Sequence, residues 1–425
     1  MTSPLGIAVL GAGTVGSAVA RELMEHRDRL ATRAGGPLRL LCVAERDRRR
    51  LDGVDLPGIH VIADAGDAVG WPGVDVVVEL LGGLEPAGTL IDAALGSGLG
   101  VVTANKAVIA HRGHELAGRV RHGSGGLAFE AAVGAAIPVL GMLRDSLGGD
   151  EVRGITAVIN GTTNFVLDRL EAGADFAGAV AEAQRLGYAE ADPAADLDGH
   201  DAAQKLCILA WFGLGARVSP EQVRRRGIRG LTSEDASAAA ASDAAIRLVA
   251  AAARSDAGLS LSVQPTLVPR SHALGGVRGA DNLVLVESDL AGTLLIGGRG
   301  AGAGAAASAV LSDLVAVARA RREQRAVPLP GAAPVPIAGN EEAETSAWLR
   351  LRVERNPDAP AIVAQMLEDR GVRVERMGRS GSGAELTVET GAAPRAVLDR
   401  ALETLDTVPV LEEVEQVLDR LEASR

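Results

Sequence analysis

Residues Gly6–Gly16 read GIAVLGAGTVG, and this stretch predicts the fold of the first part of the chain. A short apolar run has the pattern of a buried strand, Gly-x-Gly-x-x-Gly follows it directly, and Ser17–Leu30 has the pattern of a helix. In such a unit the glycines allow a tight turn and a close approach of the backbone to a pyrophosphate at the helix N-terminus. Glycine-rich turns also join strands to helices in proteins that bind nothing, but this order of elements favours a dinucleotide site. Its expected contacts are Gly11, Ala12, Gly13, Thr14, Val15 and Gly16.

The second expected strand, Leu38–Ala44, ends in charged residues that bear on the choice of cofactor. An acid at this position usually binds the ribose 2′-hydroxyl of NAD, whereas arginine accepts the 2′-phosphate of NADP. Glu45 and Arg46 offer both groups, so the sequence leaves NAD and NADP open. A solvated turn explains the run of arginines up to Arg50 equally well.

Two more strands are expected in the same sheet. Val74–Leu81 is a nearly continuous apolar run, typical of a central parallel strand covered on both faces. Gly100–Thr103 is the next strand, and Lys106 follows just past its carboxyl end, where open α/β sheets bind ligands. A surface lysine that only caps the strand is the alternative for Lys106. The cofactor contacts expected at this edge are Gly82, Thr103 and Lys106.

The middle of the chain, Ala183–Lys205, reads AQRLGYAEADPAADLDGHDAAQK and concentrates acidic residues. Pro193 places Ala189–Gly199 in a loop, after which a helix is expected to end near Gly213. Asp201 and Lys205 then share one helix face, and the carboxylate keeps the ammonium in place and protonated, as a proton donor requires. On spacing alone, a solvated acidic turn with a surface ion pair is an equal alternative. The clustered carboxylates are Glu190, Asp192, Asp196, Asp198 and Asp201.

A calcium loop does not explain this acidic segment. Asp196-Leu-Asp198-Gly199 imitates part of an EF-hand loop. With Gly199 at the sixth position, however, Ala194 and Lys205 occupy the first and twelfth positions, where carboxylates are needed.

Length, charge and cysteine content restrict the class of protein. The 425 residues predict two to four domains, and 2% aromatic residues with 53 glycines imply cores built from Leu, Val, Ile and Ala. A net charge of −12 argues against nucleic acid or an anionic membrane surface as a partner. Two cysteines fit a reducing compartment, and no signal peptide or membrane-spanning run is evident. A soluble cytoplasmic protein is expected.

The acidic segment resembles the signature of the homoserine dehydrogenases. An alanine, a Gly-aromatic pair, Asp-Pro, Asp-Leu-x-Gly-x-Asp and a lysine all occur at the family's spacing. Three other stretches resemble the same family: VVTANKAVIA at 101–110, FEAAVGAAIPV at 129–139 and INGTTNF at 159–165. The resemblance covers essentially the whole chain and matches the stand-alone form without an aspartate kinase. It implies NAD(P)-dependent interconversion of L-aspartate 4-semialdehyde and L-homoserine, a step in threonine, methionine and isoleucine biosynthesis. The signature residues are Ala183, Gly187, Tyr188, Asp192, Pro193, Asp196, Leu197, Gly199, Asp201 and Lys205.

The resemblance also implies roles for individual residues. Lys205, beside Asp201, is expected to be the principal acid/base, with Lys106 its partner at the carbonyl oxygen. Glu190 and Asp196 are expected to hold the substrate's amino group. The bottom of the substrate pocket is expected at Asn160, Gly161 and Thr162.

The same resemblance implies functions for two glycine-rich stretches. Gly302, in Gly300-Ala301-Gly302, is expected to close on the nicotinamide. A sodium ion is expected at the backbone carbonyls of the 130–137 segment, where this chain has Ala135 and Ala136 in place of the family's usual glycines. Its expected ligands are Glu130, Val133, Ala135 and Ile137.

Three other functions compete with this interpretation. A semialdehyde dehydrogenase that forms a thioester needs an activated cysteine, but Cys42 and Cys207 both lie in apolar surroundings typical of inert core residues. A non-catalytic amino-acid sensor is the second, although the presence of Lys106 and Lys205 argues against it. The third is a paralogue that reduces a related amino-acid aldehyde.

The expected fold class is α/β, in three domains. Residues 1–132 form a Rossmann-type dinucleotide-binding domain and residues 133–320 an α+β substrate and dimerisation domain, so a homodimer or homotetramer is expected. The second domain should contain an alanine-rich helix at Glu234–Arg254 and strands near Leu261–Val268, Leu283–Glu287 and Gly292–Ile296.

A linker rich in Pro, Ala and Gly, residues 321–346, precedes a last domain that should fold on its own. Residues 347–425 have an ACT-like β-α-β-β-α-β pattern, although the segment after Val408–Val410 by itself has a helical pattern. The stretch from Asp358 resembles the first helix of an ACT module, with Ala361 in place of a glycine that lets an effector approach. Threonine is the implied effector.

Overall fold

The computed structural model describes residues 3–51, 53–338, 344–380 and 383–421. Its contacts divide the chain into two compact units, and each unit is built from three separate segments. The first unit contains residues 1–155, 204–221 and 284–335. The second contains residues 156–203, 222–283 and 336–425. This grouping follows contacts rather than chain order and differs from the linear division expected from the sequence.

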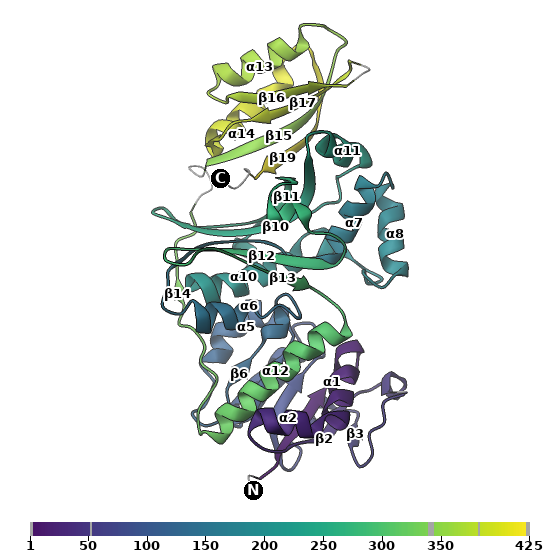
Figure 1. The fold of residues 1–425 in the computed structure, drawn as a ribbon, viewed down its shortest axis with the longest axis vertical. Helices are drawn as coiled ribbons and strands as arrows, with labels where there is room; N and C mark the ends of the chain where they lie inside the picture. Colours follow the sequence, from purple (N-terminus) through teal and green to yellow (C-terminus); the bar gives the residue numbers. More distant parts are fainter. Residues whose placement is uncertain (1–2, 52, 339–343, 381–382, 422–425) are drawn as a thin grey trace. The chain divides into compact units, whose positions relative to one another are not determined.

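A six-stranded parallel sheet forms the centre of the first unit, in the order β3-β2-β1-β4-β5-β6 (Figure 1). This is the strand order of dinucleotide-binding folds, so the expected Rossmann-type domain is confirmed. Buried Val and Ile side chains on both faces make the central strands continuous apolar runs. The strands are β1 (Leu5–Leu10), β2 (Leu38–Ala44), β3 (His60–Ile62), β4 (Val74–Glu79), β5 (Gly100–Thr103) and β6 (Leu127–Ala128).

Helices cover both faces of this sheet. The expected helix at Ser17–Leu30 is two helices, α1 (Thr14–Glu25) and α2 (Arg27–Ala34), which meet at His26. The other helices that follow the strands are α3 (Ala65–Val69), α4 (Ala87–Gly96), α5 (Lys106–Ala117) and α6 (Val139–Gly141), and a π-helical turn (Met142–Ser146) continues α6.

A late helix, α12 (Ala303–Arg322), completes the core of the first unit. It lies beside α1 and α2 (Figure 1) and also packs against β5. Its residues Val310, Leu314 and Val317 are fully buried. Among the described residues it is the one helix long and apolar enough to span a membrane, but here its apolar face belongs to the core. This alanine-rich segment has no clear pattern in the sequence, and no helix is expected there.

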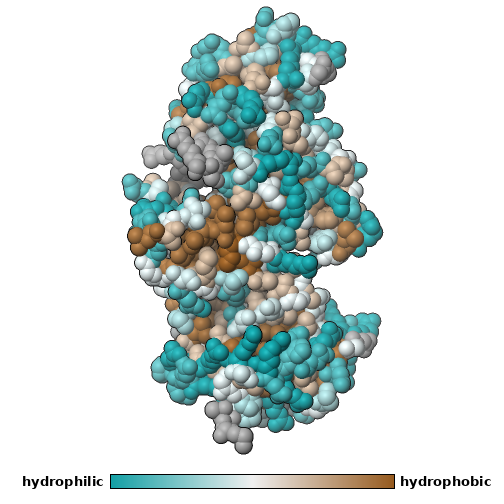
Figure 2. Space-filling model, in the orientation of Figure 1, coloured by the Kyte–Doolittle hydropathy of each residue, from teal (hydrophilic) through white to brown (hydrophobic). Residues whose placement is uncertain are grey.

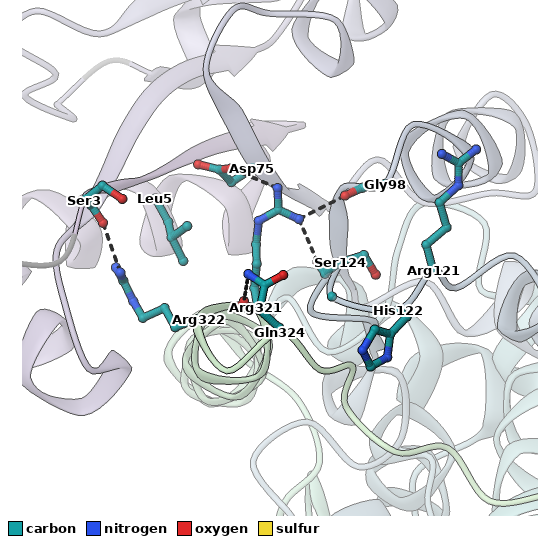
Figure 3. Close-up of a pocket in the computed structure, with 11 residues that line it drawn as sticks. Ser3, Leu5, Asp75, Gly98, Arg121, His122, Ser124, Arg321, Arg322 and Gln324 are labelled. Atoms are coloured by element: carbon teal, nitrogen blue, oxygen red, sulfur yellow. Dashed lines mark hydrogen bonds and ion pairs between the residues drawn. The ribbon is translucent and has the colours of Figure 1, made fainter.

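Arginines at the end of α12 fasten it to the amino end of the sheet (Figure 3). Arg321 donates to the carbonyl oxygens of Gly98 and Ser124 and to the carboxylate of Asp75, at 2.9–3.1 Å. Arg322 donates to the carbonyl oxygens of Ser3 and of Pro37. These residues line a cavity of about 590 Å³. Since both guanidinium groups bind protein oxygens, they act as a clamp rather than as a second ligand site.

Several short strands and helices lie outside the parallel sheet and the helices that cover it. Strand β12 (Asp281–Ser288) and β13 (Gly292–Arg299) are neighbours, as are β8 (Ala216–Arg217) and β14 (Ala333–Pro334). The others are β7 (Val152–Val158), α7 (Gly161–Glu171), α8 (Phe176–Arg185), α9 (Ala194–Leu197), α10 (His200–Leu214), β9 (Arg224–Arg225), α11 (Ser233–Ala241) and β18 (Ala393–Pro394).

A long antiparallel hairpin in the second unit corrects one expectation. The helix expected at Glu234–Arg254 is wrong beyond Ala241: β10 (Ala244–Ser255) pairs along its whole length with β11 (Gly258–Pro269). Asp243 has a φ of 53°, which breaks the helix. Burial of Ala244–Ala250 between packed neighbours then outweighs the helix propensity of alanine.

The C-terminal residues continue the sheet that contains β10 and β11, in the order β10-β11-β19-β15-β17-β16. Strand β19 (Leu411–Arg420) replaces the helix expected after Val410, because it pairs with β15 on one edge and β11 on the other. Residues 339–343 of the expected linker lie outside the described residues. The other elements are β15 (Glu344–Val353), α13 (Ala359–Asp369), β16 (Val374–Arg379), β17 (Glu385–Thr390) and α14 (Arg395–Glu403). With β19 they give a β-α-β-β-α-β order, but its last strand is Leu411–Arg420 rather than the expected Val408–Val410.

Candidate active site and cofactor pocket

The turn after β1 forms one wall of a cavity of about 480 Å³ at the carboxyl end of the parallel sheet. Gly11 has a φ of 93°, and a Cβ atom there would lie 2.8 Å from the carbonyl oxygen of Leu80. A Cβ atom on Gly16 would lie 1.9 Å from the carbonyl oxygen of Gly11, so this turn requires glycine at both positions. Five of the expected cofactor contacts line the cavity: Gly11, Gly13, Glu45, Arg46 and Gly82.

The carboxylate of Glu45 is bound to the protein itself. It accepts the backbone N–H of Ala12 at 2.9 Å and that of Asp47 at 3.0 Å, and Arg50 lies 3.8 Å away. The side chain is only 8% exposed, and its hydrogen bond with Ala12 holds the glycine-rich turn in place. Arg46 and Arg50 line the cavity beside it.

Lys106 is the first residue of α5 and is half-buried. Asn105 caps the helix, because its side-chain oxygen accepts the backbone N–H of Val108 at 3.1 Å. Thr103, expected as a cofactor contact, is fully buried and donates to Glu79. Sequence reasoning missed Glu79, although an ionisable residue inside a run of valines is the signal that could have found it.

Two carboxylates of the acidic segment converge on one amide in the second unit. Asn160, which caps α7, donates through Nδ2 to Asp196 at 2.7 Å and to Asp201 at 2.9 Å. The Thr162 hydroxyl lies 2.6 Å from the carbonyl oxygen of Tyr188 and 3.2 Å from Asp196, so its single proton is shared between these two acceptors. The expected catalytic carboxylate and three expected substrate contacts therefore form one cluster. Gly161, between Asn160 and Thr162, packs against the backbone of Ala280.

The other acidic residues of the segment have different surroundings. Asp192 accepts the backbone N–H of Ala194, and Asp198 forms an ion pair with Arg229. Both therefore stabilise the loop. Glu190 is exposed in the turn before α9, where its carbonyl oxygen accepts from Gln184. The structure thus brings Asp196, but not the Glu190 carboxylate, into the cluster around Asn160.

Helix α10 contains both Asp201 and Lys205. The two residues are four positions apart, so they share a face in its first turns. Asp201 is buried and Lys205 is half-buried. At the start of α12, Gly302 has a φ of 112°, a conformation that favours glycine.

Comparisons with known proteins identify the family. A family model described as homoserine dehydrogenase matches residues 138–315, and one described as the homoserine dehydrogenase NAD binding domain matches residues 11–130. The chain is 40% identical to the homoserine dehydrogenase of Corynebacterium glutamicum over 99% of its own length and 96% of that protein. The chain belongs to the homoserine dehydrogenase family. It is therefore an NAD(P)-dependent oxidoreductase that acts on a small molecule. The homoserine dehydrogenase activity expected from the sequence is confirmed.

Solved homoserine dehydrogenases have the same fold. The enzyme from Thiobacillus denitrificans matches with a TM-score of 0.93 at 33% identity, over 99% of both chains. A hyperthermophilic archaeal homoserine dehydrogenase in complex with NADPH matches with a TM-score of 0.65 at 27% identity. The match covers all of that shorter protein and 77% of this chain.

The cysteines of this homoserine dehydrogenase are unsuited to thioester chemistry. Both are free and buried. Burial raises the pKa of the Cys42 thiol to about 11 and, together with the charge of Glu221, that of Cys207 to about 12. A thiol with such a pKa is not an activated nucleophile at neutral pH, which agrees with the interpretation from sequence.

The segment expected to hold sodium is a tight turn beside two partly buried carboxyl groups, those of Glu130 and Asp313. Ala135 has a φ of 48°, so the alanine adopts the left-handed conformation that glycine would take, at a cost of about 1–2 kcal/mol. The Glu130 carboxylate accepts the N–H groups of Leu140 and Gly141, and Asp313 accepts the N–H of Glu130. Burial raises the pKa of both carboxyl groups, that of Asp313 well above its usual range.

Backbone carbonyl oxygens in such a turn are suitable ligands for a hard cation. The raised pKa values favour the neutral form of both neighbouring carboxyl groups, so the carbonyl oxygens rather than these side chains support a cation here. Side chains offer no comparable site: within the described residues, no group of three or more His, Cys, Asp or Glu is placed to hold a metal.

Proposed function

We propose that Lys205 and Lys106 move the proton in this homoserine dehydrogenase, with Lys205 as the principal acid/base. A bound reduced nicotinamide dinucleotide supplies the hydride for the aldehyde carbon of L-aspartate 4-semialdehyde. The carbonyl oxygen then needs one proton to become the hydroxyl group of L-homoserine, and the reverse reaction returns it. A lysine ammonium held beside Asp201 is a suitable donor.

The composition of the chain carries this proposal. Lys106 and Lys205 are the only two lysines among 43 lysine and arginine residues. Arginine serves as the cation everywhere else, on the surface and in ion pairs alike. A guanidinium keeps its proton at any pH a protein survives, whereas an ammonium can release it. Lysine in just these two positions therefore fits proton transfer better than charge alone.

We also propose that Asp196 and Asp201 hold the amino group of the substrate, with Glu190 nearby in the same segment. Asn160 provides two neutral N–H donors to this carboxylate pair. A protonated amino group would form charge-assisted hydrogen bonds with these carboxylates, which are stronger than hydrogen bonds between neutral groups. Thr162 fixes the orientation of Asp196.

For the cofactor, we propose that NADP is accepted at least as well as NAD. Both oxygens of Glu45 already accept backbone N–H groups, while Arg46 and Arg50 line the cavity. This arrangement favours a 2′-phosphate over a free 2′-hydroxyl.

Four broader features complete the proposal. The carbonyls of Glu130, Val133, Ala135 and Ile137 hold sodium, which would stabilise the turn rather than take part in the chemistry. The C-terminal β-α-β-β-α-β domain is ACT-like, and the protein works in the cytoplasm. The chain forms a homodimer or homotetramer: Figure 2 shows hydrophobic residues gathered in a patch on one face, and Leu290 and Leu295 of the β12–β13 hairpin are 84% and 53% exposed.

The test is cofactor absorbance with aspartate semialdehyde and, in reverse, with homoserine. Replacing either lysine by alanine should lower kcat by about 10²–10⁴-fold. Replacing it by arginine should be as harmful, because the charge remains but the proton is not released. A near-normal kcat in the arginine variants would show that the lysines contribute only positive charge. A wild-type protein that binds cofactor but turns over neither substrate would instead support a sensor.

A further inference from the structure

Glu79, the last residue of β4, is a fully buried carboxylate at the carboxyl end of the parallel sheet. One oxygen accepts the hydroxyl of Thr103 at 2.5 Å, and the other accepts the backbone N–H of Leu81 at 2.7 Å. Burial raises the pKa of Glu79, and hydrogen bonds from Thr103, Leu81, Gly82 and Asn105 oppose that rise. The carboxylate is thus surrounded by neutral donors that all point towards it.

These hydrogen bonds belong to a ring that joins two strand ends. Thr103 donates to Glu79 and accepts the backbone N–H of Asn105 at 2.9 Å. Asn105 in turn donates to the carbonyl oxygen of Gly83 at 2.7 Å and caps α5 with its other amide atom. The ring therefore fixes the 80–83 turn and the residue immediately before Lys106 to each other.

Each side of the ring borders a functional element. Leu81 and Gly82 are part of the wall of the cofactor cavity. Gly82 and Gly83 have φ values of 77° and 71°, a conformation that favours glycine, and two adjacent glycines lose much conformational freedom when the turn is held in one shape. On the other side, Asn105 sets where α5 begins and hence the position of Lys106.

A buried carboxylate is a costly way to build a turn, since removing its charge from water is unfavourable. Glutamine in the same place would offer only one acceptor oxygen. Its NH₂ group could not accept the hydrogen bond from the Leu81 N–H or the Thr103 hydroxyl. Only a carboxylate accepts on both sides at once.

We propose that Glu79 is a positioning residue for the reaction. It holds the wall of the cofactor cavity and the start of α5 in one fixed geometry, so that the cofactor and Lys106 meet the aldehyde together. The inferred effect of Glu79 on kcat rests on the proposed role of Lys106, whereas its inferred effect on cofactor binding does not.

The test compares Glu79→Gln and Thr103→Val with Thr103→Ser, which keeps the hydroxyl. Glu79→Gln and Thr103→Val should each lower kcat by about 10–100-fold, the scale of a small misplacement of reacting groups. Both variants should also weaken NADPH binding, which the fluorescence of the bound cofactor measures. Thr103→Ser should keep kcat and NADPH binding near their wild-type values. Thr103→Val removes one hydroxyl and keeps the shape, so it tests the ring even where Glu79→Gln does not fold.

Combination with Lys106→Ala separates positioning from general stability. In that background Glu79→Gln should still weaken NADPH binding but should lower kcat by less than about 3-fold, since the residue that it positions is gone. An undiminished loss of kcat in the double variant would overturn the inference, as would wild-type kcat and binding in Thr103→Val. A Lys106→Ala enzyme with normal kcat would instead refute the proposed proton transfer and leave the binding effect of Glu79→Gln as the measure of its role.

Discussion

Glu45 shows how one side chain restricts the choice of cofactor. In many dinucleotide-binding sheets the acid at the end of the second strand is available to the ribose. Here the carboxylate is nearly buried and accepts two backbone N–H groups, one of them from the glycine-rich turn itself. Arg50 is 60% exposed and lines the cavity, so its guanidinium is available to an anion.

Arg50→Ala should therefore affect the two cofactors unequally. Loss of a hydrogen bond to a charged group costs about 1.5–3 kcal/mol, so the KM for NADPH should rise by roughly 10–150-fold while that for NADH changes little. Arg49→Ala is a matched control, because Arg49 pairs with Asp47 and is 85% exposed. Equal changes for NADH and NADPH would show that Arg50 does not contact the 2′-phosphate.

Single residues differ in how far the sequence alone could assign them. Asp201 and Lys205 could be paired because the spacing of one helix fixes their shared face. The contacts of Asn160 with Asp196 and Asp201 join residues up to 41 positions apart, so only the fold reveals them. Glu79 was missed for the same reason, since its partners come from the neighbouring strand and the next turn.

Among the helices, α5 and α10 carry the two lysines and pack together through aromatic rings. His114 of α5 lies 4.1 Å from Trp211 of α10, measured between ring centroids. Gly113 leaves no space for a side chain, because a Cβ atom there would lie 2.8 Å from the same indole. Burial, with a smaller effect of the Arg217 charge, lowers the pKa of His114 to about 4.

This low pKa predicts a dependence of stability on pH. Below pH 6.5 the unfolded chain protonates His114 while the folded chain does not, so the contribution of this residue is lost as the pH falls from about 6.5 towards 4. At pH 5 the loss should be about 1–2 kcal/mol. His114→Phe keeps an aromatic ring against Trp211 and should remove this part of the pH dependence. Denaturant unfolding of both proteins at pH 5 and 7.5 measures it, and parallel pH profiles would contradict the prediction.

Elements with strong patterns could be predicted, and elements determined by tertiary pairing could not. The valine-rich strands and the glycine-rich turn identified the parallel sheet. By contrast, Ala244–Ser255 and Leu411–Arg420 have compositions that favour helices, yet both are strands because neighbouring strands pair with them. The long helix α12 has few distinguishing residues besides alanine, and its partners α1, α2 and β5 lie far earlier in the chain.

At the scale of the whole chain, the C-terminal residues are closely joined to the rest of the second unit. Strand β19 pairs with β11, so the C-terminal sheet and the β10–β11 hairpin share hydrogen bonds. Arg350 of β15, whose side chain is 9% exposed, donates to Asp235 of α11 at 2.7 Å and also pairs with Glu415. These contacts tie residues 344–421 to the rest of their unit more tightly than a flexible linker would.

Truncation after Ala338 should therefore separate stability from catalysis. The candidate lysines and carboxylates all precede residue 206, and a solved homoserine dehydrogenase bound to NADPH corresponds to only 77% of this chain. We expect kcat to stay within about 3-fold of the full chain, because the chemistry needs none of the removed residues. Removal of β19 and Arg350 leaves Thr266 and Leu267 of β11 without their strand partner and Asp235 without its ion pair, so the melting temperature should fall by about 5 °C or more, at 2–4 °C per kcal/mol.

Arg350→Met in the full chain is the matched control for this truncation, because it removes the ion pair and leaves β19 in place. It should lower the melting temperature by less than truncation does. If the proposed ACT-like domain binds threonine, millimolar threonine should inhibit the full chain weakly or not at all, since Ala361 would add a methyl group where the glycine of an ACT module lets an effector approach. Strong inhibition that disappears on truncation would show that the domain senses threonine despite Ala361. A folded but inactive truncated enzyme would show instead that catalysis depends on the strands that residues 344–421 contribute.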